Sequence, residues 1–323
     1  MPTTLVRWSQ RLLKGLALSI LASLNTQAAN LIVGDQSYSA RTVMEAAGVL
    51  EDLPYELEWK QFTAGSPVAE ALNVGSLDIG LLGDSPALFM GALGAPIKVI
   101  GVSRQNLDGV AIVVRKDSPI NTVADLAGKK VAIWKGSFSQ QLMLTALDKA
   151  GVARDAVDYR YLSALDSSHA LDGGSVDAIA TWEPYVTQQE RQGARIIATA
   201  EGLIPAQSFI VANDQTIKDK RAQISDFLQR LQAARAWSVS DPQHNERYAN
   251  AWSALTKADA EVARRWFSRA QVVVVPITAQ VVAGAQQTID FFNNAGLTKR
   301  YPAASVFDES FSAALADQAQ AVR

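Results

Sequence analysis

The sequence predicts an α/β fold built as two lobes. Short apolar runs rich in β-branched residues recur between helix-like segments, which is the pattern of parallel strands joined by crossover helices. The chain has 323 residues, and beyond about 250–300 residues a single hydrophobic core usually gives way to two. No long Gly/Ser linker interrupts the sequence, so we expect the chain to pass directly from one lobe to the other.

The first 28 residues are interpreted as an export signal and set aside from the fold. Arg7, Arg11 and Lys14 form a positive segment, and the apolar run 16–24 (LALSILASL) is too short to span a bilayer. Small residues follow up to Ala28, which predicts cleavage after this residue and a periplasmic protein without a membrane anchor. The alternative is an uncleaved anchor, although no second apolar stretch approaches twenty residues.

Ten strands are expected before residue 213, each a run of mostly apolar or β-branched residues bounded by turn residues. A helix is expected at Gln140–Lys149, where apolar side chains form one stripe and Gly151 ends the segment. The expected strands are Leu31–Gln36, Tyr55–Phe62, Leu77–Gly83, Ile97–Ser103, Val110–Arg115, Lys130–Trp134, Val157–Leu162, Val176–Trp182, Arg195–Thr199 and Ser208–Ala212.

After Asn213 the pattern becomes helical, and no further strand is expected. Residues 224–231 place their large apolar side chains at helical spacing. A last long helix is expected from about Thr278, as the N-cap, to Asn294, with Gly296 just beyond its end.

Charge and composition exclude several functional classes. The formal net charge is −2 and becomes more negative once the basic signal is removed, so a nucleic-acid partner is not expected. The absence of cysteine excludes disulfides, thiolate metal sites and cysteine nucleophiles. The two histidines, His169 and His244, lie in helix-like segments away from the turns that end strands. We therefore expect no metal site, no cofactor and no catalytic residue.

Four stretches resemble, in the same order, the aliphatic sulfonate, taurine and nitrate-type solute-binding proteins of ABC transporters. They are 62–67 (FTAGSP) with 70–80 (EALNVGSLDIG), 83–86 (GDSP), 135–139 (KGSFS), and 174–178 (GSVDA) leading to 182–185 (WEPY). Residues 118–130 and 276–296 are also similar, so the resemblance covers the chain after the signal.

The resemblance implies the type II periplasmic binding-protein fold, in which each lobe is a mostly parallel sheet flanked by helices. Lobe one would comprise residues 29–108 and 211–323, with the C-terminal helices on it, and lobe two residues 109–210. The chain would cross between the lobes near 107–113 and 206–213, which are the expected hinge. A ligand closes such lobes only through contacts with both of them.

The same resemblance implies a solute-binding protein of an ABC importer that is not an enzyme. It would capture a small organosulfur anion, either an aliphatic sulfonate or a sulfate ester, and deliver it as a monomer to an inner-membrane permease and its ATPase. Taurine, nitrate and bicarbonate are alternative ligands. An enzyme resembling those of thiamine-pyrimidine synthesis and an extracytoplasmic sensor are alternative classes, but export argues against biosynthesis.

Three expected helix N-termini at the ends of strands would offer partial positive charge and free N–H groups to an anion. They follow the turns 83–86, 135–139 and 38–42, the last of which contains Tyr38. The resemblance places the first two on opposite walls of the cleft. The expected donors are the hydroxyl groups of Ser85, Ser137 and Ser139, although each serine also fits an ordinary N-cap.

Other candidates come from the ends of the expected strands. Gln36 is expected to donate through its amide, and Gly136 to permit close backbone approach, although a turn glycine without a ligand role fits equally well. Trp182 and Phe138 are expected to contact the organic part of the ligand, while Trp134 fits either the wall or the core.

Charged residues near these turns bear on the identity of the ligand. Arg104 is a candidate for bidentate binding of the anion, or else a solvated loop residue. Asp84 and Glu183 are candidates for receiving an ammonium group such as that of taurine, although Asp84 also suits a cap of its own helix.

Overall fold

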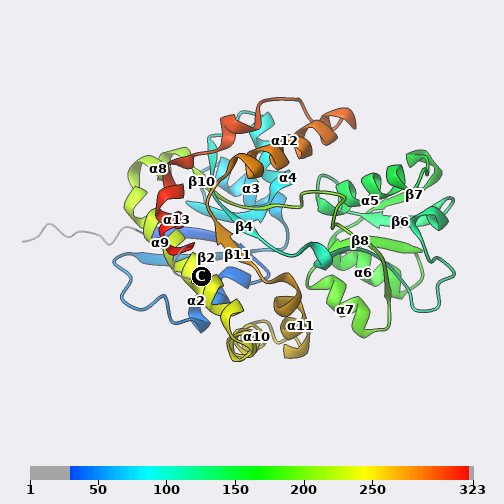
Figure 1. Cartoon of the computed structure of the whole chain (residues 1–323), viewed down its shortest axis with the longest axis horizontal. Helices are drawn as coiled ribbons and strands as arrows, with labels where there is room; N and C mark the ends of the chain where they lie inside the picture. The colour runs from blue at the N-terminus through cyan, green and yellow to red at the C-terminus, as the bar shows by residue number, and fades with distance from the viewer. Residues whose placement is uncertain (1–29, 320–323) are drawn as a thin grey trace, which may run out of the picture.

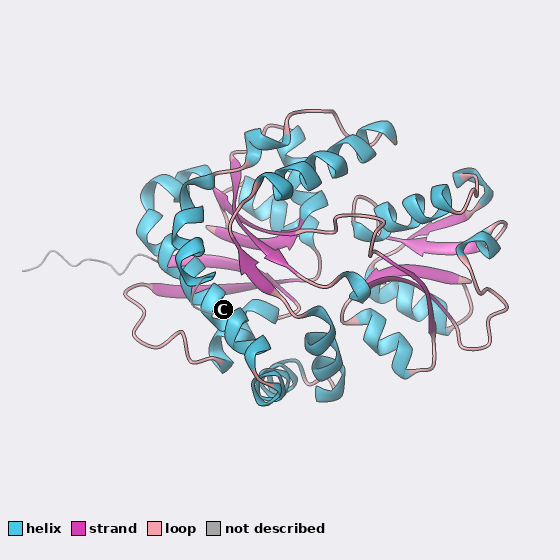
Figure 2. Cartoon of the chain, in the orientation of Figure 1, coloured by secondary structure: helices cyan, strands magenta, loops and turns pink. Residues whose placement is uncertain are grey.

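The structure, a computed structural model, describes residues 30–319 and contains two separate sheets (Figure 1). The expected export signal at 1–28 lies outside the described residues. The first sheet has the strand order β11-β4-β10-β3-β1-β2, and the second has the order β7-β6-β8-β5-β9. Helices flank both sheets (Figure 2), so the expected two-lobed α/β architecture is confirmed.

The first sheet is mixed. Strands β2 and β3 run parallel to β1, whereas β10 is antiparallel to both β3 and β4, and β11 is antiparallel to β4. Its strands are β1 (Asn30–Gln36), β2 (Glu56–Phe62), β3 (Ile79–Gly83), β4 (Ile97–Arg104), β10 (Ser208–Asn213) and β11 (Val273–Val275).

The second sheet is built from a continuous stretch of chain. Strands β7 and β8 run parallel to β6, and β5 is antiparallel to β8 and β9. Its strands are β5 (Val110–Val114), β6 (Lys130–Ile133), β7 (Asp158–Tyr161), β8 (Ala178–Trp182) and β9 (Arg195–Thr199). We call the part around the first sheet lobe one (residues 30–104 and 208–319) and the part around the second sheet lobe two (residues 110–199).

The chain crosses between the lobes twice, at residues 105–109, which include the short helix η1 (Leu107–Gly109), and at residues 200–207. The strand that follows the second crossing, β10, pairs with β3 and β4 from Ser208 onward. The expected lobe boundary after residue 210 therefore falls inside a strand of lobe one.

Helices cover both faces of each sheet. In lobe one, α2, α9, α10 and α11 contribute to one core around Phe227 and Tyr248, and α3, α4 and α12 contribute to the other around Leu72 and Ile289. The helices of lobe one are α2 (Ser39–Ala46), α3 (Gly65–Asn73), α4 (Asp84–Ala92), α8 (Asp214–Asp219), α9 (Arg221–Ser240), α10 (Pro242–Thr256), α11 (Ala260–Ala270), α12 (Ala279–Asn294) and α13 (Ser312–Ala319), with η4 (Ala303–Val306) and η5 (Glu309–Phe311).

Lobe two has its own cores on the two faces of its sheet, one under α5 and the other under α6 and α7. Its helices are α5 (Phe138–Lys149), α6 (Ala164–Asp172) and α7 (Tyr185–Arg191), with η2 (Val123–Leu126) and η3 (Arg154–Ala156). Within residues 30–319, no helix combines the length and the apolar character needed to cross a membrane.

The C-terminal part is helical as expected, and it lies on lobe one beside the N-terminal strands (Figure 1). Thr278 caps α12 by accepting a hydrogen bond from the Val281 amide, and Gly296 has the positive φ of 70° that suits the residue after a helix. The expectation of no strand after residue 213 is wrong, because residues 273–275 form β11 at the sheet edge. Three residues are too few to show strand alternation.

A glycine in β3 lets α3 lie very close to the first sheet. Gly34 and Gly80 are paired across β1 and β3. A Cβ atom added to Gly80 would lie 2.5 Å from Val68 Cγ1 and 2.8 Å from Leu72 Cδ1, both on α3. The position of α3, and of its first turn, therefore depends on the absence of a side chain at residue 80.

Replacing Gly80 with alanine is expected to destabilise lobe one by about 1–3 kcal/mol, because the added methyl group overpacks the contact with α3. Urea denaturation at constant m-value measures this change in the free energy of unfolding. Gly101→Ala in β4 is the matched control, since its nearest neighbour would lie 3.3 Å away at the end of the Ile210 side chain. Equal stability changes in both variants would show that α3 does not require Gly80.

Candidate functional site

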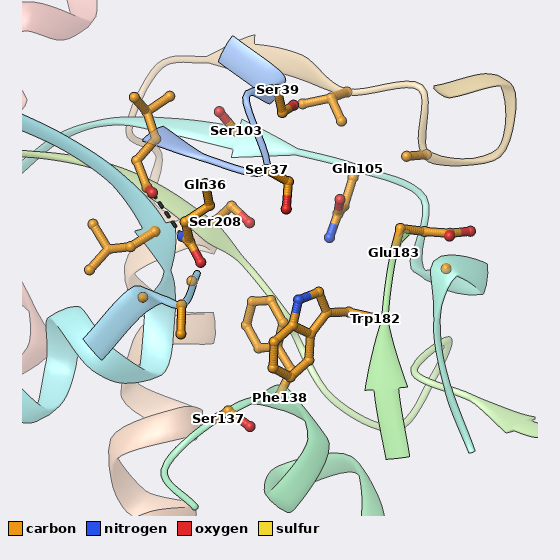
Figure 3. A pocket seen from close by; sticks show the side chains of 18 of the residues that line it. Gln36, Ser37, Ser39, Ser103, Gln105, Ser137, Phe138, Trp182, Glu183 and Ser208 are labelled. Carbon is orange, nitrogen blue, oxygen red and sulfur yellow. Dashed lines mark hydrogen bonds between the residues drawn. The ribbon is translucent and has the colours of Figure 1, made fainter. Parts of the chain in front are cut away.

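The main candidate site is a cavity of about 180 Å³ between the lobes, lined by residues of both (Figure 3). Ser37, Gln105 and Trp182 point into this common space in Figure 3. Lobe one and the first crossing contribute Asp35, Gln36, Ser37, Ser39, Thr63, Ala64, Gly65, Ser66, Leu81, Leu82, Gly83, Pro86, Ser103, Gln105, Asn106, Gly109, Ser208, Phe209, Arg235, Trp266, Ala270 and Val272, and lobe two contributes Trp134, Ser137, Phe138, Trp182 and Glu183.

The strand ends of the two lobes face one another across this cavity. A Cβ atom added to Gly83 at the end of β3 would lie 3.0 Å from Phe138 Cζ at the start of α5. A second contact between the same lobes joins α5 to α12, where Gln141 Nε2 of lobe two donates to Thr288 Oγ1 of lobe one at 3.4 Å. The turns that follow β3 and β6 therefore lie on opposite walls of one cleft.

Arg235 brings a positive charge to this cavity from α9. Its side chain is only 5% exposed, with Nη1 donating to Tyr248 Oη at 3.0 Å and Nη2 donating to Ser39 Oγ at 2.8 Å. Its Nε has no hydrogen-bond partner, and it forms no ion pair, among the described residues. Because a buried guanidinium is costly unless it is paired, this group has the capacity to bind an anion.

The residues that hold the guanidinium of Arg235 are themselves held by hydrogen bonds and stacking. Tyr248 donates to the backbone oxygen of Ser39 at 2.8 Å, and its ring stacks on Phe267 with the centroids 3.6 Å apart. Burial raises the pKa of Tyr248, so its hydroxyl remains protonated at neutral pH. The orientation of the guanidinium is therefore fixed by α2, α10 and α11 together.

Asp35 ends β1 near Arg235, but its carboxylate serves the backbone. It accepts hydrogen bonds from the amides of Ala40 at 3.2 Å and Arg41 at 3.0 Å, in the first turn of α2. Burial raises the pKa of Asp35 to about 6, while the bonds to these amides and the charge of Arg235 oppose the rise. Asp35 thus accepts hydrogen bonds from two first-turn amides of α2, the helix N-terminus that was expected to bind the ligand.

Most of the other helix N-termini at the cavity are also capped by the chain itself. The carboxylate of Asp84 accepts from Ser85 in the first turn of α4, Ser137 accepts from the Ser139 amide in α5, and Glu183 accepts from the Thr187 amide in α7. One first-turn amide of α5 and one of α7 are therefore already bonded within the protein, and Ser85 of α4 directs its hydroxyl group to Asp84.

Helix α3 is different, because its N-cap residue is Ala64, which has no side-chain acceptor. Gly65 and Ser66 line the cavity, and their amides have no acceptor among residues 30–319. An open helix N-terminus carries about half a positive charge together with free N–H donors. With Arg235, it is the second group in this cleft suited to an anion.

The opposite wall is aromatic. Trp134, Phe138 and Trp182 line it from lobe two, and the two tryptophan rings are tilted with centroids 6.5 Å apart. Phe209 and Trp266 contribute from lobe one. This wall offers apolar contact surface for the organic part of a ligand.

The sequence-predicted residues divide into two groups. Gln36, Ser137, Phe138, Trp182 and Glu183 line the cavity, as does Trp134. Two of them have donors that are already used: Gln36 Nε2 donates to the Leu81 oxygen at 2.9 Å, and Ser137 Oγ donates to the Trp134 oxygen at 2.7 Å.

The remaining predicted residues do not line the cavity. Asp84, Ser85 and Ser139 are fully buried, the first two bonded to each other and the third accepting from the Trp134 amide at 2.7 Å. Local hydrogen bonds at the helix starts therefore take up these groups in this arrangement of the lobes.

Tyr38, Arg104 and Gly136 lie beside the cavity. Tyr38 is the half-buried N-cap of α2 with a left-handed φ of 57°, and Gly136, with φ of 69°, lines a neighbouring cavity against Phe89. Arg104 is exposed and pairs with Val273 in β11, so the following residues of the crossing line the cleft instead.

Two important groups were missed by sequence reasoning. Arg235 lies within a helical segment nearly 200 residues after β1, and no local pattern marks it. The start of α3 did carry a signal, because the segment 62–67 belongs to the family resemblance and has alanine where a capping side chain is usual.

Comparison with known proteins agrees with this arrangement. A family model described as NMT1/THI5 like matches residues 55–245. A relative from Escherichia coli (strain K12), provisionally named an aliphatic sulfonates-binding protein, is 34% identical over 266 residues, which is 81% of this chain and 83% of the relative.

Two solved structures share the fold over most of their length. The periplasmic aliphatic sulphonate binding protein SsuA from Escherichia coli has a TM-score of 0.78 and 31% identity, covering 86% of this chain and 92% of that one. The alkanesulfonate-binding protein SsuA from Xanthomonas axonopodis pv. citri, solved bound to MOPS, has a TM-score of 0.79 and 30% identity, covering 87% and 99%. The expected periplasmic binding-protein fold is confirmed.

The buried carboxylate of Asp84 generates a prediction about pH. Burial raises the pKa of Asp84 to about 6, above its ordinary value, although hydrogen bonds from Ser85 and Thr288 oppose the rise. Between about pH 4 and pH 6 the folded protein therefore binds more protons than the unfolded chain, so this group's contribution to stability falls as pH rises. Over this window the free energy of unfolding of the wild type should fall by up to about 3 kcal/mol relative to that of Asp84→Asn, because the pKa of Asp84 is about two higher than in the unfolded chain.

Denaturation by urea at several pH values measures this difference. Asp117→Asn is the control, since the Asp117 side chain is 89% exposed and its removal should not change the pH dependence. A constant difference between wild type and Asp84→Asn from pH 4 to pH 7 would contradict the assignment.

Proposed function

This chain belongs to the NMT1/THI5-like family, and on that premise we propose that it is the solute-binding protein of an ABC importer for a small organosulfur anion. The ligand, an aliphatic sulfonate or a sulfate ester, would be held in the cleft between the two lobes. Residues 30–104 and 208–319 would move as one body and residues 110–199 as the other, with 105–109 and 200–207 as the hinge.

The observation that carries this proposal is the unpaired Nε of the buried Arg235 at the wall of the cleft. An anion bound there would form the direct ion pair that Arg235 lacks among the described residues, since the nearby carboxylate of Asp35 is bonded to the backbone instead. A charge-assisted hydrogen bond to a guanidinium is worth about 1.5–3 kcal/mol. Arg235 is therefore the proposed anchor of the anionic group.

The start of α3 would supply further donors. A sulfonate or sulfate group has three oxygen atoms that share one negative charge, and each accepts hydrogen bonds. The free amides of Gly65 and Ser66 at an uncapped helix end suit such a group. This role replaces the one that the sequence suggested for Ser85 and Ser139.

The aromatic wall favours an organic ligand over nitrate or bicarbonate. Trp134, Phe138 and Trp182 would pack against a carbon chain or ring, and a small inorganic anion would leave this surface without contact. The two carboxylates of the cavity, Asp35 and Glu183, already accept hydrogen bonds from the protein. They are thus poorly placed to receive an ammonium group, which disfavours taurine.

The partners follow from the family. Solved relatives are periplasmic binding proteins, and the expected export signal would place this chain in the same compartment, where it would act as a monomer. Delivery would be to an inner-membrane permease and its ATPase. The residues do not favour an enzyme on this scaffold: the sequence has no cysteine, neither His169 nor His244 lines the cavity, and the carboxylates that do line it already accept hydrogen bonds from the protein.

A thermal-shift panel with purified protein tests the ligand class. Butane-1-sulfonate and butyl sulfate are expected to stabilise the protein, by about 2.7 kcal/mol at a hundredfold excess over the dissociation constant. Taurine, nitrate and bicarbonate should have smaller effects at the same concentration. Stabilisation by the inorganic anions alone would contradict the proposal, and conversion of the organic compounds during incubation would indicate an enzyme.

Replacing Arg235 with glutamine tests the anchor directly. Loss of its charge should weaken butane-1-sulfonate binding by about 1.5–3 kcal/mol for each hydrogen bond lost, as measured by isothermal titration calorimetry. Arg230→Gln is the matched control on α9, because Arg230 pairs with Asp226 and does not line the cavity. The assignment fails if both variants bind butane-1-sulfonate as the wild type does.

A further inference from the structure

An ion-pair system joins the lobes beside the ligand cavity, at the contact between α7 of lobe two and α11 of lobe one. Arg269 of α11 donates from Nη1 to Glu183 Oε1 at 3.0 Å and from Nη2 to Glu190 Oε2. The side chain of Arg269 is 22% exposed and that of Glu183 only 6%. Partial burial reduces solvent screening of the attraction between these groups, although burial also raises the pKa of Glu183 against the effect of Arg269.

The other end of α11 is also joined to α7. Asp259, the N-cap of α11, pairs through Oδ2 with Arg191 Nη1 at 2.6 Å. Here lobe two supplies the cation and lobe one the anion, the reverse of the first pair. Because Asp259 is more exposed, solvent screens this pair more strongly, and Arg269 is the stronger of the two connections.

Arg269 is connected to the hinge as well as to lobe two. Asn106, in the first crossing, donates from Nδ2 to the Arg269 backbone oxygen at 3.1 Å and from its amide to the Ala270 oxygen at 2.8 Å. The backbone of Arg269 is therefore held by the hinge while its side chain holds lobe two.

Glu183 connects this contact to the ligand cavity. It lines the cavity next to Trp182, and it fixes the start of α7 by accepting from the Thr187 amide and hydroxyl at 3.1 and 2.9 Å. It also packs on the hinge, because a Cβ atom added to Gly109 would lie 2.7 Å from Glu183 Cγ. A change in the position of Glu183 would thus move a wall of the cavity.

We infer that Arg269 is a positioning residue for ligand capture, which holds the two lobes together through Glu183 and Glu190 without lining the ligand cavity itself. This inference rests on the proposed function for its effect on affinity. Without the guanidinium, two carboxylates of lobe two would face α11 with no cation between them. The closed arrangement, in which α7 and α11 are in contact as they are here, would then be less populated. The apparent dissociation constant rises in inverse proportion to the closed fraction.

The test uses the full chain with Arg269→Gln, Arg269→Lys and the control Arg265→Gln. Arg265 is on the same helix, but among residues 30–319 its ion pair is with Glu261 of α11 alone, so its loss leaves the contact between lobes unchanged. Calorimetry with butane-1-sulfonate measures affinity, and small-angle X-ray scattering of the unliganded protein measures the radius of gyration.

Arg269→Gln is expected to weaken binding about tenfold if the closed fraction falls to about a tenth, and to increase the radius of gyration of the unliganded protein. Arg269→Lys should lie between this variant and the wild type, because an ammonium group lacks the guanidinium fork that reaches both carboxylates. High salt should weaken binding to the wild type more than binding to Arg269→Gln. Arg265→Gln should match the wild type in both measurements.

Two outcomes would overturn the inference. One is an Arg269→Gln variant with unchanged affinity and radius of gyration. The other is a loss of affinity that comes with a lower melting temperature but no change in radius of gyration, since that would indicate local unfolding of α11. If no sulfonate or sulfate ester bound to the wild type, the proposed function would fail, while the scattering comparison would still test the role of Arg269.

Discussion

A buried guanidinium that forms no direct ion pair among the described residues is the physical constraint on which this account depends. Arg235 lines the cleft and is held by Tyr248 and Ser39, and its buried Nε has no hydrogen-bond partner among the described residues. Such a group costs several kcal/mol to keep charged in a protein interior unless an anion compensates it. The fold retains it through a set of contacts that joins α2, α9, α10 and α11, so the binding capacity is prepared before any ligand arrives.

The helix N-termini around the cleft differ in whether the protein itself supplies acceptors for their amide groups. At α2, α4, α5 and α7 the chain supplies its own acceptors, which fixes the helices but leaves little for a ligand. At α3 it supplies none, and Gly80 lets that helix lie close to the first sheet. One helix end and one arginine on lobe one, opposed by an aromatic wall on lobe two, make a site that is complete only when both lobes are close.

The fold was largely predictable from the sequence, because buried strands and amphipathic helices leave local periodic patterns. All ten strands expected before residue 213 are present, and only the three-residue edge strand β11 was missed. The site was less predictable. Trp182, Phe138 and Glu183 follow recognisable strand ends, but serine at a helix start does not reveal whether its hydroxyl faces a ligand or its own backbone. Arg235 reaches the cleft through tertiary packing, which no local pattern records.

A crystal structure of the protein with butane-1-sulfonate would test the central claim most directly. The account predicts sulfonate oxygens within hydrogen-bond distance of Arg235 Nε and of the amides at the start of α3, with the butyl group against Trp182 and Phe138. A sulfonate bound elsewhere in the cleft, with Arg235 Nε still lacking an anionic partner, would contradict it.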